Sequence, residues 1–249
     1  MLARVIDFET ATGDEKNDAV LEFAYTDVDF RRDGYVEHPV AAFVDPGMPI
    51  SPIARGVHHI TDDEIRLRGY VAFDWQRRLL NDNINSPDVF VAHFCDFERR
   101  FFDPDGARWI CTRKVACRLW PDAPNHKNQT LRYMLGLDDV LGASFTERAM
   151  PPHRAGPDTW VTAHIFLKQV QIALDRGHPI ERVIDFFVKW TGEPVLLHGP
   201  IRFGKHKGKE WTAVPLDYLE WIIFKADEMD EDTKFTAQHH YHERTKGTV

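Results

Sequence analysis

Short apolar runs dominate the first 45 residues and predict three β-strands in succession. The run at 2–8 (LARVIDF) is typical of a buried strand, and similar runs follow at 19–30 and 35–44. The turn-rich sequence RRDG joins the last two, so an antiparallel meander is expected. The next segment, DPGMPISPIARG, is predicted to be a loop. It leads to a helix start at TDDEI, with Thr61 as N-cap.

The pattern then changes to alternating strands and helices. DVFVAH is predicted to be a strand and DFERRFF the opening of a helix, followed by the strand RWIC and the helix TRKVACRLW. Such alternation predicts parallel strands added to the same sheet. A long helix is expected at about 156–175, and another in PIERVIDFFVKW. The fold class expected is therefore α/β, a mixed sheet flanked by helices.

The last part of the chain, 193–249, is predicted to be a separate small α+β module after a first domain at 1–192. Its segment IRFGKHKGK carries four basic residues and no acid, and VPLDYLEWII is predicted to be an apolar helix. The polar end, which includes His239, His240 and His242, is expected to be a frayed tail.

Composition indicates a globular protein, with 43% hydrophobic and 28% charged residues among 249. No apolar segment approaches the roughly 20 residues that span a bilayer, so no membrane contact is expected. The three cysteines (Cys95, Cys111, Cys117) form no CxxC pair and are interpreted as packed apolar residues rather than a disulfide framework. With a strand-like N-terminus in place of a signal-peptide pattern, they predict a cytoplasmic location.

The net charge of −8 argues against a protein that coats nucleic acid through bulk basicity. It is compatible with an enzyme that acts on nucleic acid, because metal-binding carboxylates add to the negative count while the metal ions contact the phosphate. Basic side chains are then expected to act only locally.

Four acidic residues and one histidine form the candidate chemistry. Asp7 and Glu9 share one side of the first strand, because side chains alternate along it. Glu98 follows the strand DVFVAH, and His153 and Asp158 lie at the start of the long helix. Each motif alone is typical of a solvated strand end or a helix start. Together they are what two magnesium ions and a general base need for phosphodiester hydrolysis.

These motifs resemble those of the DEDDh family of 3′–5′ exonucleases, and in particular its exodeoxyribonuclease X-like branch. The resemblance rests on Asp7-Phe8-Glu9-Thr10, His59-Ile60-Thr61, VAHFCDFERR, WICTRKVACRLWPD, HRAGPD, and FGKHKGK with VPLDYLEWI. It implies an RNase H-like fold and two Mg²⁺ or Mn²⁺ ions per site. It also implies release of nucleotides from DNA 3′ ends, single-stranded at the site, in DNA repair or degradation.

The resemblance also implies a role for each residue. Asp7 would bridge both cations, Glu9 would bind one of them and the 3′-terminal hydroxyl, and Asp158 would bind the other. His153 would deprotonate the attacking water, for which a near-neutral pKa is suited. Substrate contacts would come from Phe8, Thr10, His59, Ile60, Thr61, Phe94, Lys205, Lys207 and Lys209.

Two of these contacts have alternatives that the residues leave open. Ile60 is expected to pack beside the terminal base, or else to belong to an ordinary turn before a helix. The lysines, with Arg202, are expected to grip a phosphate backbone while Phe203 and Trp211 stack a base. The alternative for the basic segment is a solvated turn of a small sheet.

The second family motif departs from its usual form, His-Asn-x-x-Phe-Asp. Here the sequence is His93-Phe94-Cys95-Asp96-Phe97-Glu98, so a glutamate, one methylene longer, stands at the aspartate position. Asp96 is an alternative ligand, although on a helix it points about 200° away from Glu98. Octahedral Mg²⁺ tolerates displaced ligands poorly, so this motif decides how active the site is.

Three hypotheses for function follow. The first is a 3′–5′ exodeoxyribonuclease with a DNA-binding accessory module at its C-terminal end. The second is an exoribonuclease, because the same five residues serve either sugar. The third is a catalytically weakened DNA-binding protein, in which Phe94 and Glu98 mark lost activity; metal binding distinguishes it from the other two.

Overall fold

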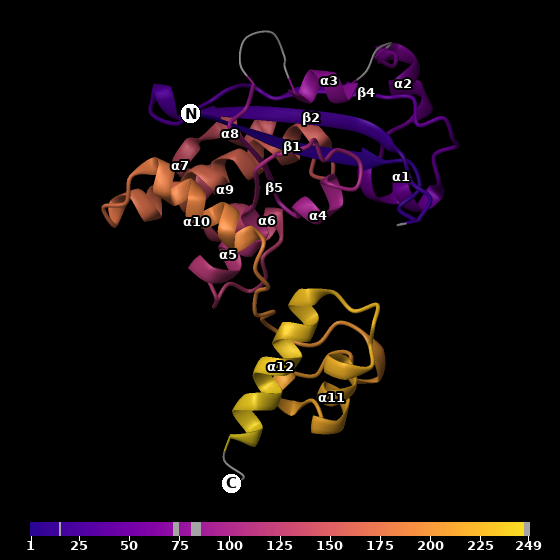
Figure 1. The fold of residues 1–249 in the computed structure, drawn as a ribbon. Coiled ribbons are helices and arrows are strands. Elements are labelled where there is room, and N and C mark those ends of the chain that lie inside the picture. The colour runs from indigo at the N-terminus through magenta and orange to yellow at the C-terminus, as the bar shows by residue number, and fades with distance from the viewer. Residues whose placement is uncertain (15, 72–74, 81–85, 247–249) are drawn as a thin grey trace.

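A mixed β-sheet forms the centre of the larger part of the chain in this computed structural model (Figure 1). The structure describes residues 1–14, 16–71, 75–80 and 86–246. Strand β1 (Leu2–Thr10) pairs antiparallel with β2 (Val20–Asp29) and parallel with β5 (Val89–Ala92), which pairs parallel with β6 (Trp109–Cys111). The α/β class and the parallel additions predicted from the alternating pattern are confirmed.

The outer edge of β2 pairs with two short strands, β3 (Tyr35–Val36) and β4 (Val40–Phe43), in place of the single strand expected at 35–44. Pro39 lies between them, and proline has no N–H to donate to the ladder. The Glu37 N–H still donates to the Asp27 carbonyl at 2.8 Å, so the chain stays beside β2 across the break.

Both faces of the sheet are covered, and the alternation of side chains along β1 decides which residue faces which layer. Ile6 and Phe8 pack with Phe23, Phe90 and other side chains in a core on one face. Ala3 and Val5 pack on the opposite face, against helices α9 (Ala155–Asp175) and α10 (Ile180–Thr191). Asp7 and Glu9 continue this second series of positions, so they point to the side of α9.

Shorter helices connect and flank the sheet. Their bounds are α1 Pro52–His58, α2 Asp62–Arg68, α3 Trp75–Leu80, α4 Cys95–Glu98, α5 Thr112–Leu119, α6 Asn128–Met134, α7 Leu137–Leu141 and α8 Ala143–Arg148, with a 3-10 turn η1 at Phe30–Arg32. Thr61 caps α2 as predicted, its hydroxyl accepting from the Glu64 N–H at 3.1 Å. The prediction of a loop at DPGMPISPIARG is wrong in the second half of that segment, where α1 begins. Ser51 caps this helix, and Pro52 fits its first turn.

The C-terminal segment has a hydrophobic core of its own, which includes Ile201, Trp211, Leu219 and Ile222. It contains the 3-10 turns η2 (Gly204–His206) and η3 (Trp211–Ala213) and the helices α11 (Leu216–Phe224) and α12 (Glu231–Thr245). The only strand-like pairing among its described residues is an isolated bridge between Pro200 and Glu210. This module stands apart from the sheet in Figure 1.

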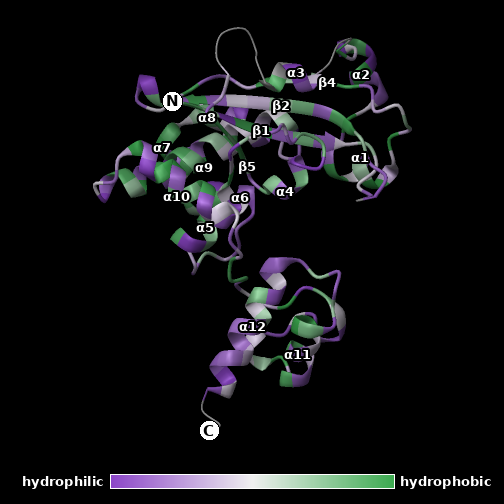
Figure 2. Cartoon of the chain, in the orientation of Figure 1, coloured by the Kyte–Doolittle hydropathy of each residue, from purple (hydrophilic) through white to green (hydrophobic). Residues whose placement is uncertain are grey.

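The frayed tail expected at the C-terminal end is wrong as far as Thr245. Asp230 caps α12, its carboxylate accepting from the Thr233 N–H at 2.8 Å. Thr236 and Ala237 are fully buried in the helix, so packing on the module core holds a segment whose sequence is largely polar. Figure 2 shows this contrast, with α12 mainly hydrophilic and α11 mainly hydrophobic.

Buried polar contacts join the module to the rest of the protein. Asp232 of α12 is 7% exposed, and its carboxylate lies 3.3 Å from the Arg113 guanidinium and 3.6 Å from the Lys114 ammonium of α5. The same carboxylate accepts from the Val195 N–H at 3.0 Å. Among the helices that the structure describes, none has the length and apolar character to cross a membrane.

Candidate functional site

Three carboxylates converge at the end of β1. Oxygens of Asp7, Glu9 and Asp158 all lie within 4.8 Å of one another. Asp158 is in the first turn of α9, which packs on the face to which Asp7 and Glu9 point. A buried hydrogen bond of 2.9 Å between the hydroxyls of Thr26 and Thr159 fixes this end of the helix to β2. The fold thus brings together residues that are 151 and 149 positions apart in the sequence.

Burial and mutual repulsion make this cluster electrostatically unfavourable without a cation. Burial raises the pKa of Asp7 well above its usual range, and the charges of Asp158 and Glu9 raise it further. The pKa of Glu9 is raised for the same reasons. Burial also raises the pKa of Asp158, against hydrogen bonds from the His153 N–H and Gln129 that lower it. A divalent cation would relieve the repulsion, and a set of carboxylate oxygens suits Mg²⁺ or Mn²⁺.

His153 lies at the rim of the cluster with an exposed side chain. Its backbone has a φ of 59°, in the left-handed region that few residues other than glycine adopt. In this conformation its N–H donates to the Asp158 carboxylate at 2.9 Å. The histidine is therefore tied through its main chain to a carboxylate of the cluster, while its ring is open to solvent and to a substrate.

An ion-pair network that sequence reasoning missed anchors the loop before α9. The Arg154 guanidinium lies 2.7 Å from Glu22 and 2.9 Å from Glu64, and the Ala155 N–H donates to Glu22 at 3.0 Å. Glu22 is 2% exposed and stands opposite Glu9 in the β1–β2 register. Arg154 thus neutralises a buried carboxylate beside the cluster. In the sequence, the only indication of a role for Arg154 was its position next to His153. Its partners could not be identified, because Glu22 and Glu64 are 132 and 90 positions away in the sequence.

Glu98 is buried beside the cluster, whereas Asp96 is exposed. Glu98 is the last residue of α4 and is 3% exposed. Among the described residues, it is not one of the three carboxylates whose oxygens lie within 4.8 Å of one another. Its Oε2 atom is buried and has no hydrogen-bond partner within the described chain. Burial raises the pKa of Glu98 to about 8, and its charge in turn raises the pKa of Asp7. A buried carboxylate oxygen without a hydrogen-bond partner, close enough for its charge to affect Asp7, fits a cation ligand.

Several expected substrate contacts have buried side chains. Ile60 has no exposed surface and packs with Leu21, Phe43 and Ile65, so the expected contact of its side chain with a base is wrong. The His58 Nδ1 atom accepts from the Ile60 N–H at 2.9 Å, which helps to turn that side chain inward. The side chains of Phe8 and Thr10 are also buried, at 4% and 8% exposure.

Other expected contacts remain available to a substrate. Phe94 is 48% exposed, with the Arg113 guanidinium 5.4 Å from the centre of its ring. His59 is exposed and has a left-handed backbone with a φ of 57°. Thr61 is exposed, although its hydroxyl already caps α2.

The basic segment lies on the surface of the module. Lys205, Lys207 and Lys209 are all exposed, which is compatible both with contact to a phosphate backbone and with a solvated turn. The expectation that Trp211 stacks a base is wrong, because its side chain is buried at 4% exposure and its ring is parallel to that of His240. Phe203 is partly buried against the same core.

His93 and the cysteines have structural surroundings. The His93 Nε2 atom donates to the His126 carbonyl at 2.8 Å, and its Nδ1 atom lies 2.9 Å from the Thr112 hydroxyl. Burial lowers the pKa of His93 to about 4, so the ring is neutral. The three cysteines are free and buried, as expected of packed apolar residues.

Comparison with known proteins supports the resemblance seen in the motifs. No family model matches the chain. The chain is 29% identical to exodeoxyribonuclease 10 of Escherichia coli K12 over 242 residues, which cover 96% of this chain and 98% of that protein. The same protein of Escherichia coli O6:H1 gives the same values. The resemblance expected from the sequence is thus confirmed over almost the whole length.

Solved structures support the fold. Exonuclease X in complex with 5′ overhanging duplex DNA shares 28% identity, with a TM-score of 0.54, and covers 74% of this chain and 99% of that one. A full-length 3′-exonuclease at 16% identity has a TM-score of 0.51 and covers 69% of this chain and 61% of its own. The RNase H-like fold implied by the motifs is confirmed.

Proposed function

We propose that this protein is a metal-dependent 3′–5′ exodeoxyribonuclease that releases nucleoside monophosphates from DNA 3′ ends. The observation that carries the proposal is the convergence of Asp7, Glu9 and Asp158 within 4.8 Å. It occurs in a chain that resembles an exodeoxyribonuclease over 96% of its length.

Asp7, Glu9, Asp158 and Glu98 are the residues that would hold the cations, Mg²⁺ or Mn²⁺. When bound, two such ions supply charge stabilisation at the attacking and leaving oxygens of the phosphodiester. The donor set fits, because three carboxylates with raised pKa values converge and Glu98 adds a buried oxygen without a hydrogen-bond partner among the described residues.

His153 is assigned to accept the proton of the attacking water on its exposed ring. The bond from its N–H to Asp158 limits how far the ring can move from the cluster, because both belong to one short segment. Arg154 holds that segment on β2 and α2, and its charge lowers the pKa of Glu9, against the charge of Glu22, which raises it. Exposed Phe94, at the start of α4, is assigned to contact a base.

The remaining assignments concern the module and the cell. We assign 1–192 to the exonuclease domain and 193–249 to an accessory module that binds DNA, in support of which the module has a separate core and an exposed basic segment. The cytoplasmic location stays a prediction from the cysteine content.

The alternatives are less well supported. An exoribonuclease would use the same carboxylates, but the relative aligned over 96% of the chain is named as an exodeoxyribonuclease. A weakened DNA-binding protein would not need to keep three converging carboxylates and a buried Glu98.

The test is hydrolysis of 5′-labelled single-stranded DNA and RNA of equal sequence with Mg²⁺, Mn²⁺ or EDTA. A ladder that shortens from the 3′ end, requires metal and forms faster on DNA is the expected result. Equal or faster hydrolysis of RNA would favour the exoribonuclease, and binding of DNA without hydrolysis in either metal would favour the weakened protein.

A further inference from the structure

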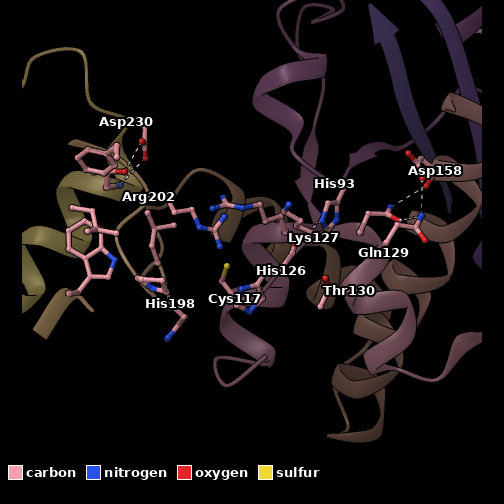
Figure 3. A pocket seen from close by; sticks show the side chains of 18 of the residues that line it. His93, Cys117, His126, Lys127, Gln129, Thr130, Asp158, His198, Arg202 and Asp230 are labelled. Carbon is pink, nitrogen blue, oxygen red and sulfur yellow. Dashed lines mark hydrogen bonds between the residues drawn. The ribbon is translucent and has the colours of Figure 1, made fainter. Parts of the chain in front are cut away.

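A cavity of about 560 Å³ lies between the catalytic domain and the C-terminal module. One end opens on His153 and Asp158, so it is continuous with the carboxylate cluster. In Figure 3, Asp158 and Gln129 lie at this end, and Arg202 and Asp230 of the module lie towards the other. Neither the catalytic domain nor the module forms this cavity alone.

Cationic side chains outnumber acidic ones along the cavity. Arg113 and Lys127 line it from the catalytic domain and Arg202 lines it from the module, whereas the acids are Asp158 and Asp230. Asp158 belongs to the proposed metal site. The Asp230 carboxylate is occupied, because it accepts from both the N–H and the hydroxyl of Thr233. In a chain of net charge −8, this is a local surface suited to a polyanion.

Two of the cations are available to a ligand. Lys127 and Arg202 are exposed, and among the described residues neither side chain makes a hydrogen bond or an ion pair. They stand on opposite sides of the junction, one from each wall. Arg113 is committed to the junction, because it contacts Asp232 as well as the ring of Phe94. That contact and the Lys114–Asp232 pair hold the two walls in place.

The size of the cavity limits what it can hold. Its volume of about 560 Å³ falls in the roughly 300–1,000 Å³ range of sites for small ligands, which suits about one or two nucleotides of a single strand but not a duplex. Imidazole rings of His126 and His198, 6.0 Å apart, stand beside it as flat surfaces for a base.

We propose that this cavity binds the single-stranded DNA immediately 5′ of the scissile phosphate, with Lys127 and Arg202 contacting its phosphates from the two walls. The proposal rests on the nuclease function proposed above. It makes the module one wall of the path of the strand rather than a detached basic surface.

The test measures binding of 5′-fluorescein single-stranded DNA of 2, 4, 8 and 12 nucleotides by fluorescence anisotropy in EDTA, so that no hydrolysis occurs. Arg202→Ala and Lys127→Ala should each weaken binding of the 8-mer about tenfold and reduce the salt slope by about 0.7, the value for one phosphate contact on a single strand. The loss should be smallest for the dinucleotide. Lys225→Ala is the matched control, because it removes one exposed charge from the same module outside the cavity.

Each contrary outcome overturns the proposal. Equal losses of DNA affinity for Arg202→Ala and Lys225→Ala would show that the module acts only through its general charge and not through the cavity. A loss for Lys127→Ala without one for Arg202→Ala would confine the strand to the catalytic domain. Equal losses on the 8-mer and on a blunt duplex would place Arg202 on duplex DNA outside the cavity. Failure of the nuclease function is separate, because it would appear as an absence of hydrolysis by the unaltered protein with metal.

Discussion

The carboxylate cluster and the two exposed cations of the cavity, Lys127 and Arg202, carry opposite charges in different environments. Asp7, Glu9 and Asp158 are held together by a strand and a packed helix, and their pKa values are raised by burial. Lys127 and Arg202 are exposed on the two walls of the junction. The acidic region, this cluster, is therefore electrostatically unfavourable until a cation binds, whereas the basic region, these two side chains, is exposed to solvent without DNA. Substitutions in the acidic region should change both activity and stability, and those in the basic region should change affinity.

The largest effect is expected for Asp7→Ala. The central carboxylate of the cluster is lost, so hydrolysis of single-stranded DNA should fall by several orders of magnitude, measured as initial rate with Mg²⁺. The rise in melting temperature that Mg²⁺ produces in the unaltered protein should disappear. Asp105→Ala is the control, because it removes an exposed carboxylate that is not part of the cluster. Its hydrolysis rate and its response to Mg²⁺ should match those of the unaltered protein. Near-normal hydrolysis by Asp7→Ala would remove this residue from the mechanism.

His153→Ala should reduce the hydrolysis rate by about 10²- to 10⁴-fold, the usual contribution of a general base. The affinity for Mg²⁺, measured by calorimetry, should change little, because no carboxylate is removed. This variant separates proton transfer from charge at the acidic region. A large loss of metal affinity would count against the assigned role.

Substitutions in the segment His93–Glu98 test whether Glu98 or Asp96 is the fourth carboxylate that binds a cation. Glu98→Ala should be nearly as damaging as Asp7→Ala, and Asp96→Ala should be mild, because Glu98 is buried and Asp96 is exposed. Glu98→Asp should lower the rate with Mg²⁺ and be partly rescued by Mn²⁺, since shortening the side chain leaves a gap in a site built for glutamate. A strong gain from Glu98→Asp would instead identify the natural protein as a weakened nuclease.

The pKa of Glu98 makes stability depend on pH. Its folded pKa of about 8 lies above its ordinary value of 4.5, so the stability contributed by its protonated form is complete below pH 4.5 and is lost as the pH rises through 8. In EDTA, Glu98→Gln should raise the melting temperature by about 3 °C or more at pH 8.5 and much less at pH 5. Equal differences at the two pH values would contradict this account of the acidic region.

The smallest effect is expected in the basic segment. Replacing Lys205, Lys207 and Lys209 by alanine should weaken DNA binding severalfold and flatten its dependence on salt, because fewer counterions are released. The rate at saturating substrate should persist, measured against the same DNA. An unchanged affinity and salt slope would mean that the basic segment does not contact DNA and is a solvated turn of the module.

The residues of the acidic region could be predicted from the sequence because each has a characteristic place on its own element, and because the motifs together resemble those of a known family. Alternation along one strand places Asp7 and Glu9 on the same face, and a helix start places Asp158. The Glu22–Arg154–Glu64 network could not be predicted, because its members meet only through the packing of β2, α2 and the loop before α9. Nor could the inward direction of Ile60, which depends on the hydrogen bond from its N–H to His58. Helix α12 was not predicted, because its sequence is polar and its stability comes from contacts with the core of the module.

The broken outer edge of the sheet has a consequence for solubility in the cell. Exposed edge strands invite another chain to extend the sheet, and long flat ones promote aggregation. Here β3 has two residues and β4 four, with Pro39 between them, and β6 at the opposite edge has three. Within the described residues, neither edge offers an unbroken row of backbone groups long enough to template intermolecular β-pairing. Replacing Pro39 by a β-branched residue would join the two short strands and remove that protection.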